Sequence, residues 1–363
     1  MGHKHDDPHP HHGADDDETR ELHDGVSDGL VALEPLDLRS IESTDDLIRA
    51  MSRTAFAGRT LGEAADILQA MVEDEECLVV CTLSGAMTVA KMGLVLCDMI
   101  DDGWVDAVVS TGALMAHGFV EATGRSHFKY DPSMDDDELF DKGYDRVYDT
   151  LELEQSLDDI ERIVYEVMLG MDPDVPYGSA EFHRLLGQWL IDNVEGRGVL
   201  KSATEKNVPV YVPAFTDSEI GLDIGLFGRR CRAKGTKAPV YDGFLDLEDY
   251  TERVERAKRI GIFTVGGGVP RNWAQQVSPY LDIIRGRLGH DTPIRRFQYG
   301  IRLCPEPAHW GGLSGCTYSE GVSWGKFVSV PDGGRYAEVL ADATVTWPIL
   351  VKAVQERLAK PSR

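Results

Sequence analysis

The chain has 363 residues, enough for one large α/β domain or two ordinary ones, and its 42 % hydrophobic content predicts a globular protein with a substantial core. Its 62 Asp and Glu residues outnumber 37 Lys and Arg residues, which gives a formal net charge of −25. Such a charge repels nucleic acid and anionic membranes, and it favours a cationic small substrate, although it also serves solubility alone. The sequence contains no long apolar run and no apolar signal region, so we expect a cytoplasmic protein that does not enter membranes.

Residues 1–40 differ from the rest of the chain. The opening "MGHKHDDPHPHHGADDDETRELHDG" is polar, charged and rich in histidine, and it is almost free of apolar residues. This composition is typical of a disordered tail, and a solvated tail is a simpler interpretation than a metal-binding one. We therefore expect a tail over residues 1–40 and one catalytic domain over residues 41–363.

The six cysteines give no sign of a metal site or of disulfides. They are scattered through apolar or glycine-rich surroundings, with no C-x-x-C pair and no zinc spacing. We interpret them as reduced thiols of the core and expect no metal cofactor.

The domain begins with a helical pattern from residue 43, in which Thr60 and Glu63 have the spacing of a capping box. Five apolar runs then predict strands, at residues 77–83, 105–111, 208–215, 259–269 and 335–342. Helical stretches such as 86–100 and 247–259 separate them, and the acidic stretch 134–143 predicts a surface loop that leads into a helix. This alternation predicts a single Rossmann-like α/β domain, with a mostly parallel sheet flanked by helices.

Small, hydroxylated or acidic residues follow the ends of these predicted strands. They occupy positions 82–85, 110–113, 216–219, 266–268 and 341–344. Glycines allow close backbone approach, helix N-termini attract phosphate, and an acid can hold ribose hydroxyls, so the set predicts a nucleotide cradle. Each segment alone is also consistent with a tight turn, and no G-x-G-x-x-G motif follows the first strand.

The segment "EGVSWGKF" at 320–327 leaves two interpretations open. If the backbone is extended, Trp324 and Lys326 point to the same side, and the indole can wall an apolar pocket that keeps the lysine amine neutral and nucleophilic. Glu320 can then bind an ammonium end of a substrate. The alternative is a packed strand end with a solvent-exposed lysine.

Seven segments, in order along residues 45–358, make the chain resemble the deoxyhypusine synthase family. They are "TLSGAMT" at 82–88, "STGALMAH" at 110–117, "VPAFTDSEIG" at 212–221, "GGGVPRN" at 266–272, "HWGGLSG" at 309–315, "EGVSWGK" at 320–326 and "ADAT" at 341–344. The resemblance implies NAD-dependent transfer of a four-carbon amine unit from spermidine through a lysine imine to an acceptor amine. It also implies a homotetramer with sites at subunit interfaces.

The resemblance assigns a role to individual residues. It implies that Lys326 carries the unit, and that Asn272 and His117 are polar groups near the reacting amine. Trp324 and Glu320 are expected to line the polyamine site. The expected cofactor residues are Ser84, Thr88, Thr111, Gly112, Asp217, Gly267, Gly268 and Asp342.

Several positions depart from the eukaryotic pattern. Leu313 and Leu222 stand where relatives carry acids that anchor spermidine, with Glu219 and Asp223 as nearby replacements, and Ala116–His117 stands in place of two acids. The pattern resembles the prokaryotic branch, so we expect putrescine to accept the unit and give homospermidine. Deoxyhypusine synthesis on a translation-factor lysine is the alternative, and a silent NAD- or polyamine-binding homologue is the second alternative.

Overall fold

The computed structural model describes residues 22–359. Residues 22–34 belong to a separate unit and contain one turn, in which the Asp24 carboxylate accepts the backbone N–H of Ser27. The chain from Pro35 onward forms one compact unit. Residues 1–21 of the histidine-rich opening lie outside the described residues, and disorder of the 1–40 tail stays a prediction.

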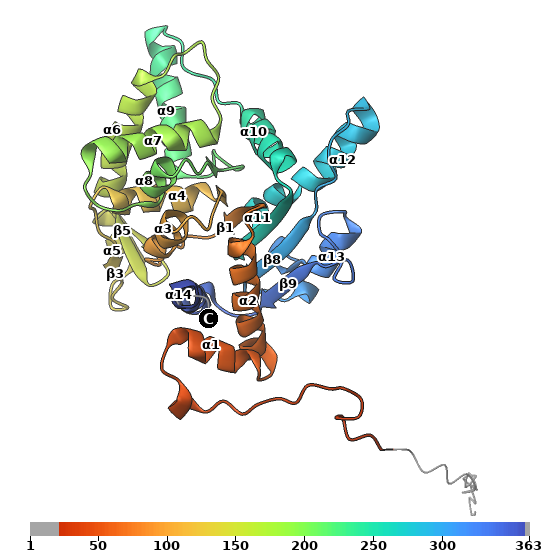
Figure 1. The fold of residues 1–363 in the computed structure, drawn as a ribbon. Helices are drawn as coiled ribbons and strands as arrows, with labels where there is room; N and C mark the ends of the chain where they lie inside the picture. The colour runs from red at the N-terminus through yellow and green to blue at the C-terminus, as the bar shows by residue number, and fades with distance from the viewer. Residues whose placement is uncertain (1–21, 360–363) are drawn as a thin grey trace, which may run out of the picture. The chain divides into compact units, whose positions relative to one another are not determined.

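A six-stranded sheet forms the centre of the compact unit, in the order β6-β2-β1-β7-β8-β9 (Figure 1). All of its strand pairs are parallel. The strands are β1 (Cys77–Leu83), β2 (Ala107–Ser110), β6 (Val210–Tyr211), β7 (Arg259–Val265), β8 (Phe297–Leu303) and β9 (Arg335–Val339). The predicted α/β class and the five predicted strands are therefore confirmed.

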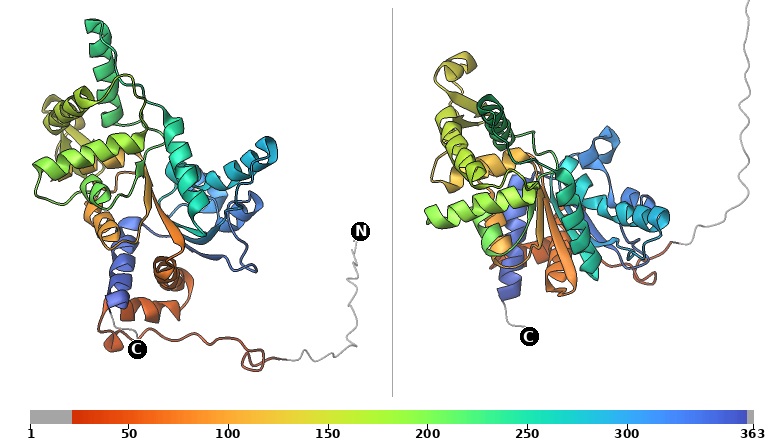
Figure 2. Two further views of the ribbon diagram at one scale, coloured as in Figure 1. Left: turned by 45° about the horizontal axis from the view of Figure 1, so that its top comes forward. Right: turned by 90° about the horizontal axis from the view of Figure 1, so that it is seen from above.

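Alternate residues of each strand face two hydrophobic cores, so the sheet is covered on both sides (Figure 2). On β1, Val79 and Cys81 contribute to one core, whereas Val80 contributes to the other. The first core includes side chains of α1 (Thr44–Ser52), α2 (Phe56–Glu73), α3 (Gly93–Asp101), α4 (Gly112–Ala122), α6 (Glu154–Gly170), α7 (Ser179–Asn193), α8 (Val199–Glu205), α9 (Glu219–Lys234) and α14 (Ala343–Ala359). The second includes α10 (Gly243–Arg256), α11 (Gly268–Gln275), α12 (Val277–Leu288) and α13 (Tyr318–Ser323).

A second, three-stranded antiparallel sheet lies outside the central one, in the order β3-β5-β4. It is built from β3 (Phe128–Lys129), β4 (Tyr144–Val147) and β5 (Thr150–Leu153), and α5 (Asp136–Asp141) precedes β4. The acidic stretch thus leads into a short helix, as predicted. The strands of this small sheet, and β8 of the central one, were not predicted from the sequence.

The predicted helix start at Thr60 is wrong. Helix α2 begins four residues earlier, at Phe56, and Ala55 precedes it without a side-chain cap. The Thr60 hydroxyl instead donates to the Phe56 carbonyl oxygen from within the helix. The capping-box pattern failed because its threonine occupies an interior position, where it bonds one turn back along the helix.

No helix among residues 22–359 is both long and apolar enough to cross a membrane. The cytoplasmic location stays a prediction.

Candidate active site

The carboxyl ends of five strands lie in one row across the sheet. The register pairs Leu83 of β1 with Ser110 of β2 and Val265 of β7, and continues through Leu303 of β8 to Val339 of β9. The segments that leave these strands therefore start side by side, as ligand-binding segments of a parallel sheet do.

The glycine segment after β7 meets the serine that follows β1. The backbone N–H of Gly267 donates to Ser84 Oγ at 2.9 Å, and Gly266 and Gly268 have φ angles of +77° and +63°, which favour glycine. A Cβ on Gly267 would lie 2.6 Å from Cα of Ser314, so the glycine lets the 311–315 loop approach. Helix α11 begins directly after this contact.

Two more helices, α4 and α9, have their N-termini at the same edge of the sheet. The hydroxyl of Thr111 caps α4 and donates to the Gly85 carbonyl at 3.0 Å. Ser218 caps α9, and a Cβ on Gly112 would lie only 2.5 Å from Cβ of Ser218. The glycine at position 112 therefore lets the starts of α4 and α9 lie against each other. Asp217 is exposed beside them.

The last two predicted cofactor residues have structural partners in the chain. The carboxylate of Asp342 accepts from the backbone N–H and the hydroxyl of Thr344 at the start of α14. Thr88 is 1 % exposed, and its hydroxyl donates to the Leu114 carbonyl at 2.8 Å. Helix N-termini, close-approach glycines and an exposed acid are groups that suit the phosphates and ribose of a dinucleotide, so this edge fits NAD.

A second group surrounds Lys326. The lysine is 8 % exposed, its Nζ donates to Asn272 Oδ1 at 3.0 Å, and it lies 6.0 Å from the ring centre of Trp324. Glu320 lines the same cavity of about 240 Å³. The predicted lysine, asparagine, tryptophan and glutamate are thus brought together, and the alternative of a solvent-exposed lysine is wrong.

The backbone that positions this lysine is not extended. Residues 318–323 form α13, Trp324 ends it, and Gly325 turns the chain with φ of +67°. Lys326 N–H then donates back to the Gly321 carbonyl. Trp324 and Lys326 therefore share the cavity through a glycine turn at a helix end, and the predicted strand alternation is wrong.

The cavity favours the neutral amine. Burial lowers the pKa of Lys326, and the Arg271 guanidinium lowers it further, whereas Cys316 and Glu320 oppose the shift. Arg271 is itself 2 % exposed, donates to the Cys316 carbonyl at 2.8 Å and lies over the Tyr318 ring. A fixed cation beside a buried lysine is an arrangement that makes the amine nucleophilic.

Replacing Arg271 by glutamine is expected to raise the pKa of Lys326 back toward its ordinary value. A smaller fraction of the amine is then neutral, so transfer near neutral pH falls about 3- to 10-fold and recovers as the pH is raised. The rate profile between pH 7 and 10 measures this, with Arg271→Lys as the control that keeps the charge. An unchanged profile in Arg271→Gln would show that Arg271 does not tune the lysine.

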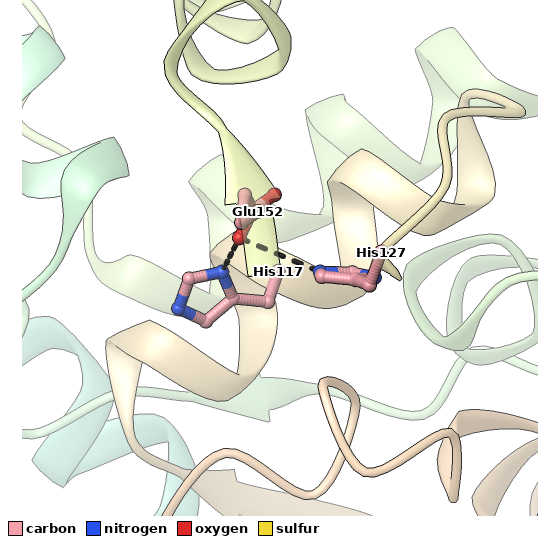
Figure 3. Close-up of side chains that lie close together, drawn as sticks. All are labelled: His117, His127 and Glu152. Carbon is pink, nitrogen blue, oxygen red and sulfur yellow. Dashed lines mark hydrogen bonds and ion pairs between the residues drawn. The ribbon is translucent and has the colours of Figure 1, made fainter. Parts of the chain in front are cut away.

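A third group surrounds His117 on α4. Its Nδ1 contacts the Glu152 carboxylate of β5, and the Nε2 of His127 lies 3.4 Å from the same carboxylate oxygen (Figure 3). The side chains of His117, Glu152 and His127 are 11 %, 2 % and 0 % exposed. Buried acid–imidazole contacts of this kind hold the rings in fixed orientations.

Further acids act on His117. Burial lowers its pKa, but Glu152, Glu219 and Asp145 more than offset this, so the pKa is raised. Burial and the carboxylates of Glu161 and Glu219 raise the pKa of Asp223 to about 7, against the opposing effect of Arg230. Neighbouring carboxylates repel one another when they are ionised, and a bound ammonium group would reduce this repulsion.

The structure therefore brings the predicted site residues into three groups. No hydrogen bond or ion pair between residues 22 and 359 joins the lysine cavity to the His117 group. Sequence reasoning missed Arg271, Glu152 and His127. Arg271 stands beside Asn272 in a segment already singled out, whereas Glu152 and His127 are brought to His117 only by the small sheet.

Comparison with known proteins decides the family. The model described as "Deoxyhypusine synthase" matches residues 46–354. The chain belongs to the deoxyhypusine synthase family. Members of this family are NAD-dependent aminobutyl transferases, so the chain is classed as a transferase of this type, with a polyamine as the substrate that the family implies.

Similar proteins occur in archaea and bacteria. The chain is 35 % identical over 324 residues to "Probable deoxyhypusine synthase 2" of Methanosarcina mazei, with 89 % of both chains covered. It is 30 % identical over 331 residues to "Deoxyhypusine synthase-like protein" of Elusimicrobium minutum, with 90 % of this chain and 84 % of the other covered. A crystal structure assigned as a deoxyhypusine synthase from Entamoeba histolytica has a TM-score of 0.58 at 13 % identity, covers 88 % of this chain and 96 % of its own, and supports the fold.

Proposed function

We propose that the protein moves the four-carbon amine unit of spermidine to an acceptor amine through an imine on Lys326, with putrescine as the preferred acceptor and homospermidine as the product. The observation that carries this proposal is the buried Lys326, whose pKa is lowered and whose amine is held by Asn272. A lysine in this state can attack an imine carbon of the donor and carry the unit covalently.

The proposed binding site for the cofactor is the row of strand ends. Ser84, Thr111, Gly112, Asp217, Gly267, Gly268 and Asp342 lie at or beside helix N-termini there and would hold NAD. When bound, NAD supplies the hydride acceptor and, later, the hydride donor. The chain's own residues contribute binding, orientation and exclusion of water.

Acids and an aromatic face would hold the polyamine. The carboxylates of Glu219 and Asp223 belong to the group around His117, and Glu320 and Trp324 belong to the lysine cavity. Carboxylates bind ammonium ends, and an indole face attracts a cationic chain. The exposed Leu313 and Leu222 offer no such charge, which agrees with a polyamine bound differently from that of eukaryotic members.

We expect the complete site to form between subunits of a homotetramer. The support for this expectation is that no hydrogen bond or ion pair joins the lysine cavity to the His117 group within residues 22–359, and that α9 exposes Leu222 and Leu226. Light scattering at micromolar concentration tests the assembly. An active monomer would exclude a site shared between chains.

A single incubation experiment identifies the acceptor amine. The protein is mixed with NAD and spermidine, and either putrescine or a lysine-bearing translation factor is added, with products identified by mass. Homospermidine as the product supports the proposal. A modified lysine on the translation factor supports the alternative, deoxyhypusine synthesis, and the names of the archaeal relatives favour that alternative. Tight binding of NAD without either product would identify a silent homologue.

A further inference from the structure

Four side chains that are distant in sequence form one chain of close polar contacts next to the candidate site. The Lys91 Nζ lies 2.8 Å from His127 Nδ1, His127 Nε2 lies 3.4 Å from Glu152 Oε2, and the same oxygen contacts His117 Nδ1. Figure 3 shows Glu152 between the two imidazoles, with the second nitrogen of His117 pointing away from the carboxylate. We call these four residues the His117 relay.

Two imidazoles and a carboxylate also form a common zinc ligand set, and their ligand atoms lie within 4.8 Å of one another. The neighbour of His127 decides against a metal. A lysine ammonium has only donors, so Lys91 must donate to Nδ1 of His127, and the ring proton must then sit on Nε2. A metal-binding imidazole shows the reverse arrangement, with its second nitrogen donating to an acceptor.

The protonation of the relay follows from this tautomer. The Nε2–H of His127 faces the Glu152 carboxylate, whose pKa is held at about 2 because hydrogen bonds and charge from the two histidines outweigh burial. An ionised carboxylate only accepts, so His117 donates to it from Nδ1. The Nε2 of His117 is then the atom left for another partner, and it makes no hydrogen bond within residues 22–359.

We propose that Glu152 is a positioning residue that orients His117 and stabilises its protonated ring, so that Nε2 of His117 exchanges a proton with an amine of the polyamine. This inference rests on the proposed function. When the His117 ring is neutral, with its proton on Nδ1, Nε2 would accept the proton of spermidine's secondary ammonium. The freed nitrogen lone pair would then form the C=N bond as the adjacent carbon loses a hydride, which bound NAD would accept. The proton returns when the final imine is reduced.

The surroundings of His117 agree with this role. Glu152 approaches from β5, His127 from the loop before β3, Asp145 from β4 and Glu219 from α9, while Lys91 and Glu121 form the outer end of the relay. An acid that orients an imidazole and stabilises its charged form is the arrangement by which carboxylates assist histidine bases. The acids of this group also suit a cationic substrate.

Replacing Glu152 by glutamine keeps the shape and removes the charge. In the protein without substrate, the pKa of His117 is expected to fall, as measured by hydrogen–deuterium exchange at the imidazole C2 position with mass spectrometry. The kcat for NADH formation from spermidine should fall about 10- to 1,000-fold, and His117→Gln should lower it about 100- to 10,000-fold. The double variant should be no slower than His117→Gln, because Glu152 acts through His117.

Two further variants keep the test decisive. Glu152→Asp retains the charge at a shorter reach and should give values between wild type and Glu152→Gln, whereas Glu138→Gln, an exposed control, should change neither quantity. The relay is overturned if Glu152→Gln leaves the pKa of His117 and kcat unchanged, or if the purified protein holds one metal ion per chain that Glu152→Gln releases. If the wild type forms no NADH, the proposed function fails, while the exchange measurement still tests the relay.

Discussion

Lys326→Ala is expected to lower aminobutyl transfer by about 10,000-fold or more while NAD remains bound. The reason is that the amine lies in a cavity of about 240 Å³, held by Asn272, and none of the other residues lining that cavity is a lysine. NAD binding should survive because the predicted cofactor residues lie along the strand ends and not in the cavity. Transfer is followed by product mass, and NAD affinity by calorimetry.

Lys326→Arg should fail almost as completely, because a guanidinium stays protonated and does not form an imine. Borohydride added during turnover should trap a butylamine adduct on Lys326 of the wild type. Lys352→Ala, on the exposed face of α14, is the matched control and should behave as wild type. Wild-type turnover by Lys326→Ala would remove the covalent carrier from the mechanism.

Gly267→Ala is expected to lower the affinity for NAD by about 100-fold. The added Cβ would lie 2.6 Å from Cα of Ser314, which is backbone and cannot rotate away. Relief of the clash must move the 311–315 loop or the start of α11, and either movement disturbs the Ser84–Gly267 contact. Calorimetric titration with NAD measures the change.

Gly286→Ala provides the comparison for this experiment. Gly286 lies inside α12, and a Cβ added at this position would have no other atom within 4 Å. Alanine should stabilise that helix by about 0.5–1 kcal/mol and leave NAD affinity unchanged. Equal NAD affinity in Gly267→Ala and wild type would place the cofactor away from the glycine segment.

Much of the fold was predictable because the central strands are nearly continuous apolar runs, as strands buried on both faces are. Strand β8 escaped prediction because Gln298 and Arg302 interrupt its apolar pattern. The structure explains Arg302, whose buried guanidinium pairs with Glu338 on β9 at 2.8 Å. A charge that is neutralised by a neighbouring strand cannot be recognised from its own segment.

The candidate site also has a part that was predictable from the sequence and a part that was not. The grouping of Lys326, Trp324 and Glu320 was predictable because these residues are close in sequence, whereas the turn at Gly325 differs from the extended backbone considered for this segment. Glu152 was not predictable, because its contact with His117 spans 35 residues and depends on a small antiparallel sheet. Its acidic side chain in "LELEQ" looks like any surface glutamate until the fold buries it.

The position of β1 between β2 and β7 has a consequence for synthesis of the protein. Its partner β7 lies 182 residues further along the chain, as the contact between the Thr82 and Thr264 hydroxyls shows. At translation rates of 5–20 residues per second, that partner follows roughly 10–40 s later. During this interval one edge of "CLVVCTL" stays unpaired on the nascent chain, and an unpaired apolar edge invites aggregation. The net charge of −25, spread along the chain, makes nascent copies repel one another while they wait for β7.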